Sequence, residues 1–78
     1  MKYEDFKKMI LTKQAVYSSI PYHHLSEYGK AYLEVLNSLT FKVKRFDDVN
    51  DLKDNIYDTM LNNQNSDIYE AFLYKLDI

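Results

Sequence analysis

The clearest helical signal in this chain lies in residues 3–20, YEDFKKMILTKQAVYSSI. The apolar side chains of this segment recur at the spacing of one helix face. They are Tyr3, Phe6, Ile10, Tyr17 and Ile20, with Met9 and Val16 widening the face. Glu4 and Asp5 fall in the first turn, where the helix dipole favours negative charge. The pattern predicts a helix from Tyr3 to about Ile20.

A second helix is expected after the break at Pro21. The residue before a proline is disfavoured in the α region, and proline itself suits the first turn of a helix. We therefore predict a helix over residues 21–39 that forms an antiparallel hairpin with the first helix. Gly29 lies inside this helix and suggests that a neighbouring helix packs closely there.

Two shorter helices are predicted in the second half of the chain. Asp47 or Asp48 provides an N-cap for a helix over residues 48–61. The run of asparagine and glutamine that follows ends this helix. Ser66 or Asp67 then caps a fourth helix that reaches the C-terminus.

The segment between the second and third helices, residues 40–46, is ambiguous. Phe41 and Val43 alternate with lysines, which is typical of a short strand. Val43 and Phe46 also continue the helical spacing from Leu39. A lone strand has no partner in this chain. We expect the end of the second helix followed by an irregular connection, with a short extended segment as the alternative.

The composition agrees with an all-α fold. One Gly and one Pro are too few turn residues for an all-β domain of 78 residues. We predict a single small domain over residues 1–78, a compact bundle of three to four short helices. Its expected core consists of Phe6, Ile10, Leu25, Tyr32, Leu36, Leu39, Ile56, Met60 and Phe72. Such a core gives marginal stability, and formation of a homodimer is a common way to increase it.

Cysteine and long apolar runs are both absent from the sequence. Without cysteine the chain has no disulfide framework and no cysteine-based metal or redox site. No apolar run approaches the roughly 18 residues that a membrane span needs. We expect a cytoplasmic protein that has no membrane partner.

Charge is divided unevenly along the chain. Residues 1–46 carry eight basic and four acidic residues, a net of +4, whereas residues 47–78 carry two basic and eight acidic residues, a net of −6. Four aspartates of the second part recur at helical spacing beside Tyr57. They are Asp47, Asp51, Asp54 and Asp58. Such an acidic stripe is usually a solvated helix face, and the functional alternative is a surface that binds a basic groove on another protein.

The basic first part of the chain provides a different candidate interface. Lys42, Lys44 and Arg45 lie between two phenylalanines, and Lys7 and Lys8 lie on the first predicted helix. Basic side chains interleaved with aromatic ones bind phosphates and stack on bases. The alternative prediction is therefore a nucleic-acid interface at these five residues, although neutralisation by the aspartates that follow Arg45 is a simpler explanation.

No catalytic or metal site is predicted. The chain has no Gly-rich phosphate loop and no nucleophile motif. On a helix, His23 and Glu27 lie one turn apart, but His24 points about 100° away from His23, and zinc usually requires three or four ligands. We expect no enzyme activity, no cofactor and no metal.

Two functional hypotheses follow. The first is a small non-catalytic inhibitor or modulator that occludes a surface of a larger host or cognate protein through Asp47, Asp51, Asp54, Asp58 and Tyr57. Phage-encoded inhibitors of host functions, antitoxins and immunity proteins are similar in type, and the frequent Lys, Asn, Ile and Tyr indicate an AT-rich bacterial or phage genome. The second hypothesis is a small dimeric nucleic-acid-binding regulator that uses the basic first part.

Overall fold

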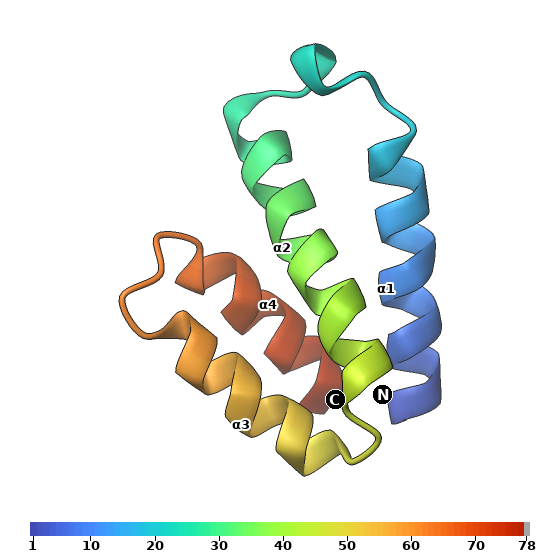
Figure 1. The fold of residues 1–78 in the computed structure, drawn as a ribbon, viewed down its shortest axis with the longest axis vertical. Coiled ribbons are helices and arrows are strands. Elements are labelled where there is room, and N and C mark those ends of the chain that lie inside the picture. Colours follow the sequence, from blue (N-terminus) through green and yellow to red (C-terminus); the bar gives the residue numbers. More distant parts are fainter. Residues whose placement is uncertain (78) are drawn as a thin grey trace.

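Four α-helices and one short 3₁₀-helix make up the computed structural model, which describes residues 1–77 (Figure 1). The elements are α1 (Tyr3–Ser18), η1 (Tyr22–His24), α2 (Glu27–Arg45), α3 (Val49–Met60) and α4 (Ser66–Asp77). No strand occurs in this part of the chain, which confirms the predicted all-α bundle. Among the helices of residues 1–77, none combines the length and the apolar content that a membrane crossing requires.

The first two helices form the antiparallel hairpin that the sequence predicts (Figure 1). At one end of the hairpin, the ring centroids of Tyr17 and Tyr32 lie 4.9 Å apart. At the other end, the Tyr3 hydroxyl donates a hydrogen bond to the carbonyl oxygen of Phe46, just after α2. The beginning of α1 therefore lies beside the end of α2. The helix α1 ends at Ser18, slightly earlier than predicted.

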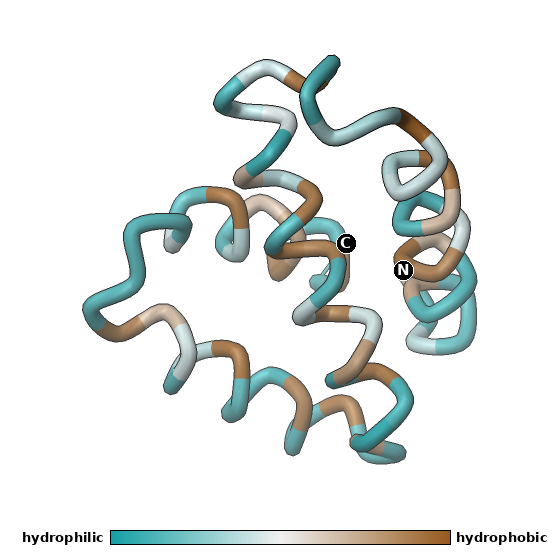
Figure 2. Tube along the Cα trace, turned by 45° about the horizontal axis from the view of Figure 1, so that its top comes forward, coloured by the Kyte–Doolittle hydropathy of each residue, from teal (hydrophilic) through white to brown (hydrophobic). Residues whose placement is uncertain are grey.

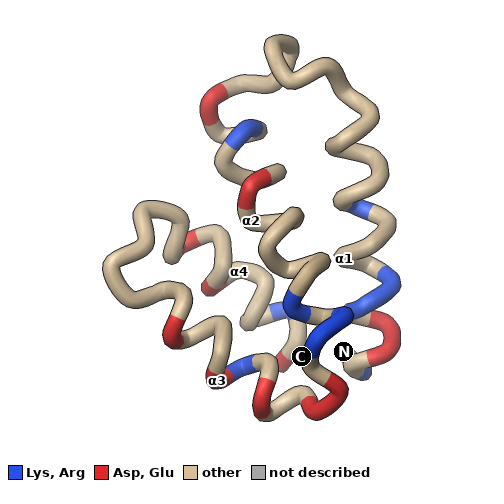
Figure 3. The backbone as a smooth tube through the Cα atoms, viewed as in Figure 1, with Lys and Arg blue, Asp and Glu red and all other residues tan. Residues whose placement is uncertain are grey.

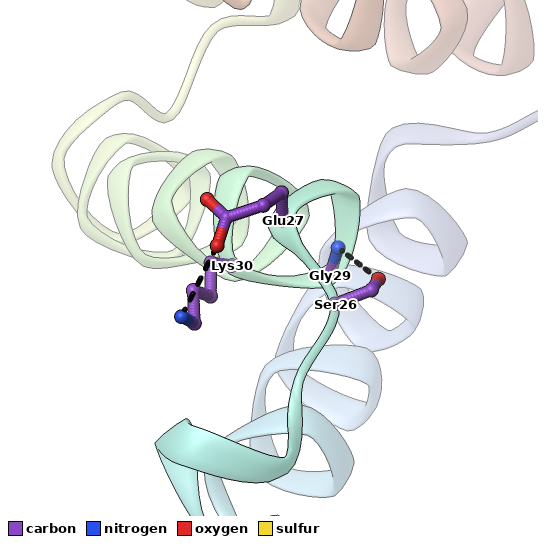
Figure 4. Close-up of polar contacts among 4 residues, drawn as sticks. All are labelled: Ser26, Glu27, Gly29 and Lys30. Carbon is purple, nitrogen blue, oxygen red and sulfur yellow. Dashed lines mark hydrogen bonds and ion pairs between the residues drawn. The ribbon is translucent and has the colours of Figure 1, made fainter.

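The start of α2 differs from the prediction. Pro21 precedes η1, and α2 begins only at Glu27. The Ser26 hydroxyl accepts a hydrogen bond from the Gly29 N–H at 3.0 Å, as Figure 4 shows. This cap starts the helix because it satisfies a backbone donor of the first turn. Gly29 lies in that turn, where an added Cβ would meet atoms of Ser26 and Leu25, so the expected close approach of another helix is wrong.

The end of α2 also differs, because residues 40–45 are helical. The expected order, the end of the second helix followed by an irregular connection, is confirmed, but the helix reaches Arg45 and the connection begins only at Phe46. The alternative extended segment is wrong. Leu39 and Val43, one helical turn apart, are both buried in the core, whereas Phe41 is exposed. Burial of that helical face outweighs the strand-like alternation of apolar and basic residues.

A side-chain cap fixes the start of α3, as predicted for Asp48. Its carboxylate accepts hydrogen bonds from the N–H groups of Asn50 and Asp51, at 2.7 and 3.3 Å. Beyond the end of α3, Asn62 adopts the left-handed conformation with φ 59°. Asparagine tolerates this conformation well, so Asn62 turns the chain toward α4.

The predicted caps of α4 are shifted by one or two residues. Ser66 and Asp67 lie inside the helix, and the residue before it is Asn65. The Asn65 carbonyl oxygen accepts the N–H groups of Ile68 and Tyr69, at 3.0 and 3.2 Å. Asn65 therefore accepts two hydrogen bonds from the first turn of the helix, and the Asn63 carbonyl oxygen accepts the Ser66 N–H at 3.2 Å.

The core lies where the inner faces of the helices meet, and Figure 2 shows hydropathy alternating along each helix. Six of the nine predicted core residues are buried: Phe6, Ile10, Leu36, Leu39, Ile56 and Phe72. Tyr32 and Met60 are half-buried at the edge of the core, and Leu25 lies outside it. The other buried apolar residues are Leu33, Val35, Val43, Leu52, Ile68, Tyr69, Leu73 and Leu76. Phe72 packs α4 against α2 through the Tyr32 ring, at 5.4 Å between centroids.

Candidate partner-binding surface

Three of the predicted aspartates share the solvent side of α3. Asp51, Asp54 and Asp58 are exposed, and the opposite side of the helix buries Leu52 and Ile56. This burial follows from the apolar spacing of the helix, which turns the acidic residues outward. We refer to Asp51, Asp54 and Asp58 as the acidic face of α3.

Asp47 is not part of this helical stripe. It precedes the cap residue Asp48, outside α3, and is exposed. Its charge lies near the start of α1. Burial raises the pKa of the Tyr3 hydroxyl, and the negative charges of Asp47, Glu4 and Asp48 raise it further. The predicted set of four aspartates therefore divides into three residues on α3 and one beside α1.

The acidic face of α3 has no cationic partner within residues 1–77. The ion pairs in this part of the chain are Lys7–Glu4, Lys30–Glu27 and Lys53–Asp77, at 3.7, 3.4 and 2.6 Å. Figure 3 shows acidic segments following one another along α3. The one basic residue of this helix is Lys53. Because Lys53 pairs with Asp77, it leaves the three aspartates of the acidic face uncompensated.

Tyr57 lies beside the acidic face and is 53% exposed. It borders a hollow between α3 and α4 with a volume of about 340 Å³. The other walls of this hollow come from Met60 on α3 and from Glu70, Leu73, Tyr74 and Asp77 on α4. The predicted tyrosine anchor is thus next to a partly apolar surface to which a second helix contributes.

The outward side of α4 extends this surface. Asp67, Glu70, Ala71 and Tyr74 are all exposed, and Tyr74 is 67% exposed. We call these four residues the outer face of α4. They border a second, larger hollow of about 830 Å³, which is completed by Met1 and Lys75. Sequence reasoning missed this face, because helical spacing shows which residues lie opposite the core but not which of them border a hollow.

The alternative basic residues gather at the end of the hairpin where α1 begins and α2 ends (Figure 3). Lys8, Lys44 and Arg45 are exposed there. Lys7 pairs with Glu4 and lies over the Tyr3 ring, at 4.4 Å from the ring centroid. Lys7 is thus next to an acidic and an aromatic group of the protein itself, and the Arg45 guanidinium lies 5.2 Å from the centroid of the Phe46 ring.

Lys42 is used by the fold. Its Nζ donates hydrogen bonds to the Asn55 Oδ1 and, at 2.8 Å, to the Thr59 Oγ1, both on α3. Burial lowers the pKa of the Lys42 ammonium, and the charge of Arg45 lowers it further. The structure therefore places Lys42 between α2 and α3, whereas Lys44 and Arg45 face solvent.

The histidines and Glu27 do not share a helix face. His23 and His24 lie on η1 with their rings 4.2 Å apart, whereas Glu27 is the first residue of α2. The proposed one-turn spacing of His23 and Glu27 on a single helix is therefore wrong. Within residues 1–77 no three His, Cys, Asp or Glu side chains are placed to hold a metal ion.

A further surface that sequence reasoning missed is the tip between α1 and α2. Residues 14–26 contain no Lys, Arg, Asp or Glu, and this end carries no charge colour in Figure 3. Val16 and Tyr22 are exposed on the tip, and Tyr28 is exposed just beyond it. The sequence alone shows that these residues carry no charged side chain. The structure shows in addition that the tip projects from the bundle (Figure 1).

No protein-family model, curated protein or solved structure matches this chain. The surfaces described above are therefore the basis for a functional proposal. Of these surfaces, the α3–α4 side combines uncompensated carboxylates with exposed aromatic rings and two hollows.

Proposed function

We propose that this protein is a small non-catalytic inhibitor or modulator that occludes a surface of a larger protein. The observation that carries the proposal is the acidic face of α3, whose carboxylates are exposed and uncompensated beside the half-exposed Tyr57. The partner surface is a basic groove, and the encounter takes place in the cytoplasm. The expected biological type is a phage-encoded inhibitor of host functions, an antitoxin or an immunity protein.

The proposed interaction uses charge for attraction and an aromatic ring for affinity. Asp51, Asp54 and Asp58 pair with Lys or Arg of the partner, which increases the association rate and selects against acidic surfaces. Tyr57 supplies contact area at the edge of this face, and tyrosine is enriched among interface hot spots. Like charges one turn apart cost the free helix a few tenths of a kcal/mol per pair. A basic partner removes that repulsion.

The first test is capture of a partner from a nuclease-treated lysate of a low-GC bacterial host. The parent chain should retain one stoichiometric protein, and the double variant Asp54→Lys/Asp58→Lys should lose it. The matched control is Asp5→Lys/Glu34→Lys, which makes the same change of net charge at exposed positions of α1 and α2. Equal retention by both double variants would contradict the proposal.

Nucleic-acid binding by a dimer is the second candidate. It is favoured by the antiparallel hairpin, which brings Lys7 and Lys8 to the same end as Lys44 and Arg45 (Figure 3). Lys42 would contribute less, since it donates to α3. This candidate requires duplex DNA or RNA affinity that falls steeply with salt and that Lys8→Ala/Lys44→Ala/Arg45→Ala removes. No binding at low salt would exclude it.

A further inference from the structure

We propose that the outer face of α4 binds the same face of a second copy of this chain, in a two-fold symmetric dimer centred on Ala71. Ala71 is exposed in the middle of this face and borders the larger hollow. The walls of that hollow come from α4 and from Met1. The inference is therefore independent of the proposed function, which uses α3.

The charges along α4 are placed symmetrically about Ala71. Asp67 lies four residues before Ala71, and Lys75 lies four residues after it. Residues four positions apart lie on the same side of a helix, so these three residues follow one another along the face. Because the helix rises about 1.5 Å per residue, each charged residue lies about 6 Å from Ala71 along the helix axis. One end of the face is thus acidic and the other end is basic.

A second copy of α4 in the antiparallel direction matches this order. A two-fold axis beside Ala71 reverses the direction of the helix, so that Asp67 of each copy comes level with Lys75 of the other. The dimer then contains two pairs of opposite charge. A parallel arrangement would instead bring like charges together, and like charges across an interface oppose association. The order of charge therefore favours the antiparallel dimer.

The shape of the face is also self-complementary. Tyr74 lies nearly one turn from Ala71, is 67% exposed and borders the hollow of about 830 Å³. In the two-fold arrangement, the Tyr74 ring of each copy lies in the depression beside Ala71 of the other. Helices pack by placing ridges into grooves, and a small residue allows close approach. The ring supplies contact area while its hydroxyl keeps a polar partner or water.

The charged groups around the two hollows comprise as many cations as carboxylates. They are the Met1 ammonium, Lys53 and Lys75, and Asp67, Glu70 and Asp77. Lys53 and Asp77 already pair within the chain. Glu70 also borders the smaller hollow beside α3, so it lies at the rim of the proposed interface, where solvent screens its charge. This balance selects neither a basic nor an acidic partner, and a second copy supplies the same charges in reverse order.

The length of α4 sets the expected strength of the dimer. The helix has 12 residues and is therefore about 18 Å long. A contact between two helices of this length is at the low end of interface sizes, below about 1,200 Å² in total. We therefore expect a dimer that dissociates in the micromolar range.

Sedimentation velocity of the full chain from about 1 to 500 μM measures this association, and the parent should pass from monomer to dimer over the range. Ala71→Glu should weaken association at least about tenfold, because two carboxylates then face each other across the two-fold axis. Ala15→Glu, at an exposed position of α1, is the matched control. It adds the same charge outside the face and should associate like the parent.

A mixture of two charge-reversed variants tests the antiparallel order. Asp67→Lys and Lys75→Asp should each associate much more weakly than the parent, because each places like charges at both ends of the dimer. An equimolar mixture should dimerise, since a pair formed from one copy of each variant restores both pairs of opposite charge. Circular dichroism shows that each variant is folded before the two are mixed.

Three outcomes would overturn the inference. The first is a parent chain that stays monomeric at about 500 μM. The second is equal association of Ala71→Glu and Ala15→Glu, which would place the contact on another surface. The third is a mixture of the folded charge-reversed variants that associates no better than either variant alone. Capture of a partner by the parent but not by Asp54→Lys/Asp58→Lys supports the proposed function in each of these cases, because that variant changes α3 alone.

Discussion

At the shared end of α1 and α2, Lys7 lies between the Glu4 carboxylate and the Tyr3 ring, and Lys42 donates to side chains of α3. On α3 itself, Asp54 and Asp58 are exposed, and no cation among residues 1–77 pairs with them. Some of the basic side chains at this end are therefore engaged in contacts within the fold, whereas the carboxylates of α3 are available to bind a partner. The difference shows that net charge along a sequence is a poor guide to which charges are free to bind a partner.

The largest expected effect comes from weakening the contact between the α1–α2 hairpin and the α3–α4 part of the bundle. Phe72 is buried and packs the α3–α4 part of the bundle against Tyr32 of the α1–α2 hairpin. Phe72→Ala should lower the free energy of unfolding by about 3–5 kcal/mol, because it leaves a cavity in the core. Since small domains have a total stability near 5 kcal/mol, much of the variant should be unfolded. Urea denaturation followed by circular dichroism measures this loss, and parent-like stability would place Phe72 outside the essential core.

Lys42 and Lys44 separate a lysine used by the fold from one that faces solvent. Lys42→Met should cost about 1 kcal/mol of unfolding free energy, because the Asn55 and Thr59 side chains lose their donor. Lys44→Met, at an exposed position, should stay within about 0.5 kcal/mol of the parent. Chemical denaturation of both variants gives the comparison, and equal effects would contradict the distinction.

Asp47 and Asp48 likewise separate a carboxylate that faces solvent from a neighbouring one that makes hydrogen bonds within the fold. Asp48→Ala should cost about 1 kcal/mol, because the first turn of α3 loses its cap. Asp47→Ala removes an exposed carboxylate that lies outside the helix and should leave stability nearly unchanged. The prediction fails if thermal unfolding shows equal shifts for the two variants.

Alkaline pH tests the half-buried aromatic cluster of the hairpin. Burial raises the pKa of the Tyr32 hydroxyl above 10.0, and the hydroxyls of Tyr17 and Tyr28 raise it further. Above pH 10 the unfolded chain therefore loses this proton more readily than the folded chain, so stability that is present below pH 10 is lost as pH rises. Tyr32→Phe should lose less stability than the parent over this range, with Tyr22→Phe as a comparison at an exposed position. Parallel profiles of unfolding free energy against pH for the parent and Tyr32→Phe would contradict the claim that ionisation of Tyr32 causes this loss.

The smallest expected effect concerns repulsion on α3 in the free protein. Asp54→Asn/Asp58→Asn removes two like charges one turn apart and should stabilise the chain by a few tenths of a kcal/mol at low salt. Added salt should reduce the gain, because exposed charges are screened. Denaturation at two salt concentrations measures the difference, and a loss of stability would indicate that these carboxylates serve the fold.

Helical spacing and capping chemistry made much of this fold predictable. The apolar spacing of α3 identified Ile56 as a core residue, and the Asp48 cap was predicted to within one residue. The start of α2 was missed because Pro21 is a strong local signal, whereas Ser26 lacks the acidic residue three positions later that marks a capping box. Residues 40–45 fit two periodicities, and only burial of Val43 against the rest of the bundle decides between them.

The candidate surface was predictable only in part. The spacing of Asp51, Asp54 and Asp58 indicated one helix face, and the structure places all three in solvent. The contribution of Tyr74 depends on how α4 packs beside α3, which local sequence patterns do not specify. The use of Lys42 by the fold was hidden for the same reason, since its partners Asn55 and Thr59 lie on another helix.

The most direct measurement of the central claim is a calorimetric titration of the captured, purified partner at two salt concentrations. The parent chain should bind with an affinity that falls as salt rises, because the acidic face of α3 provides attraction. Asp54→Lys/Asp58→Lys should bind at least about 100-fold more weakly at low salt, a loss of about 2.7 kcal/mol. Its affinity should rise with salt, as the introduced repulsion is screened. Equal affinity and equal salt dependence of the two proteins would contradict the claim that the free carboxylates of α3 bind the partner.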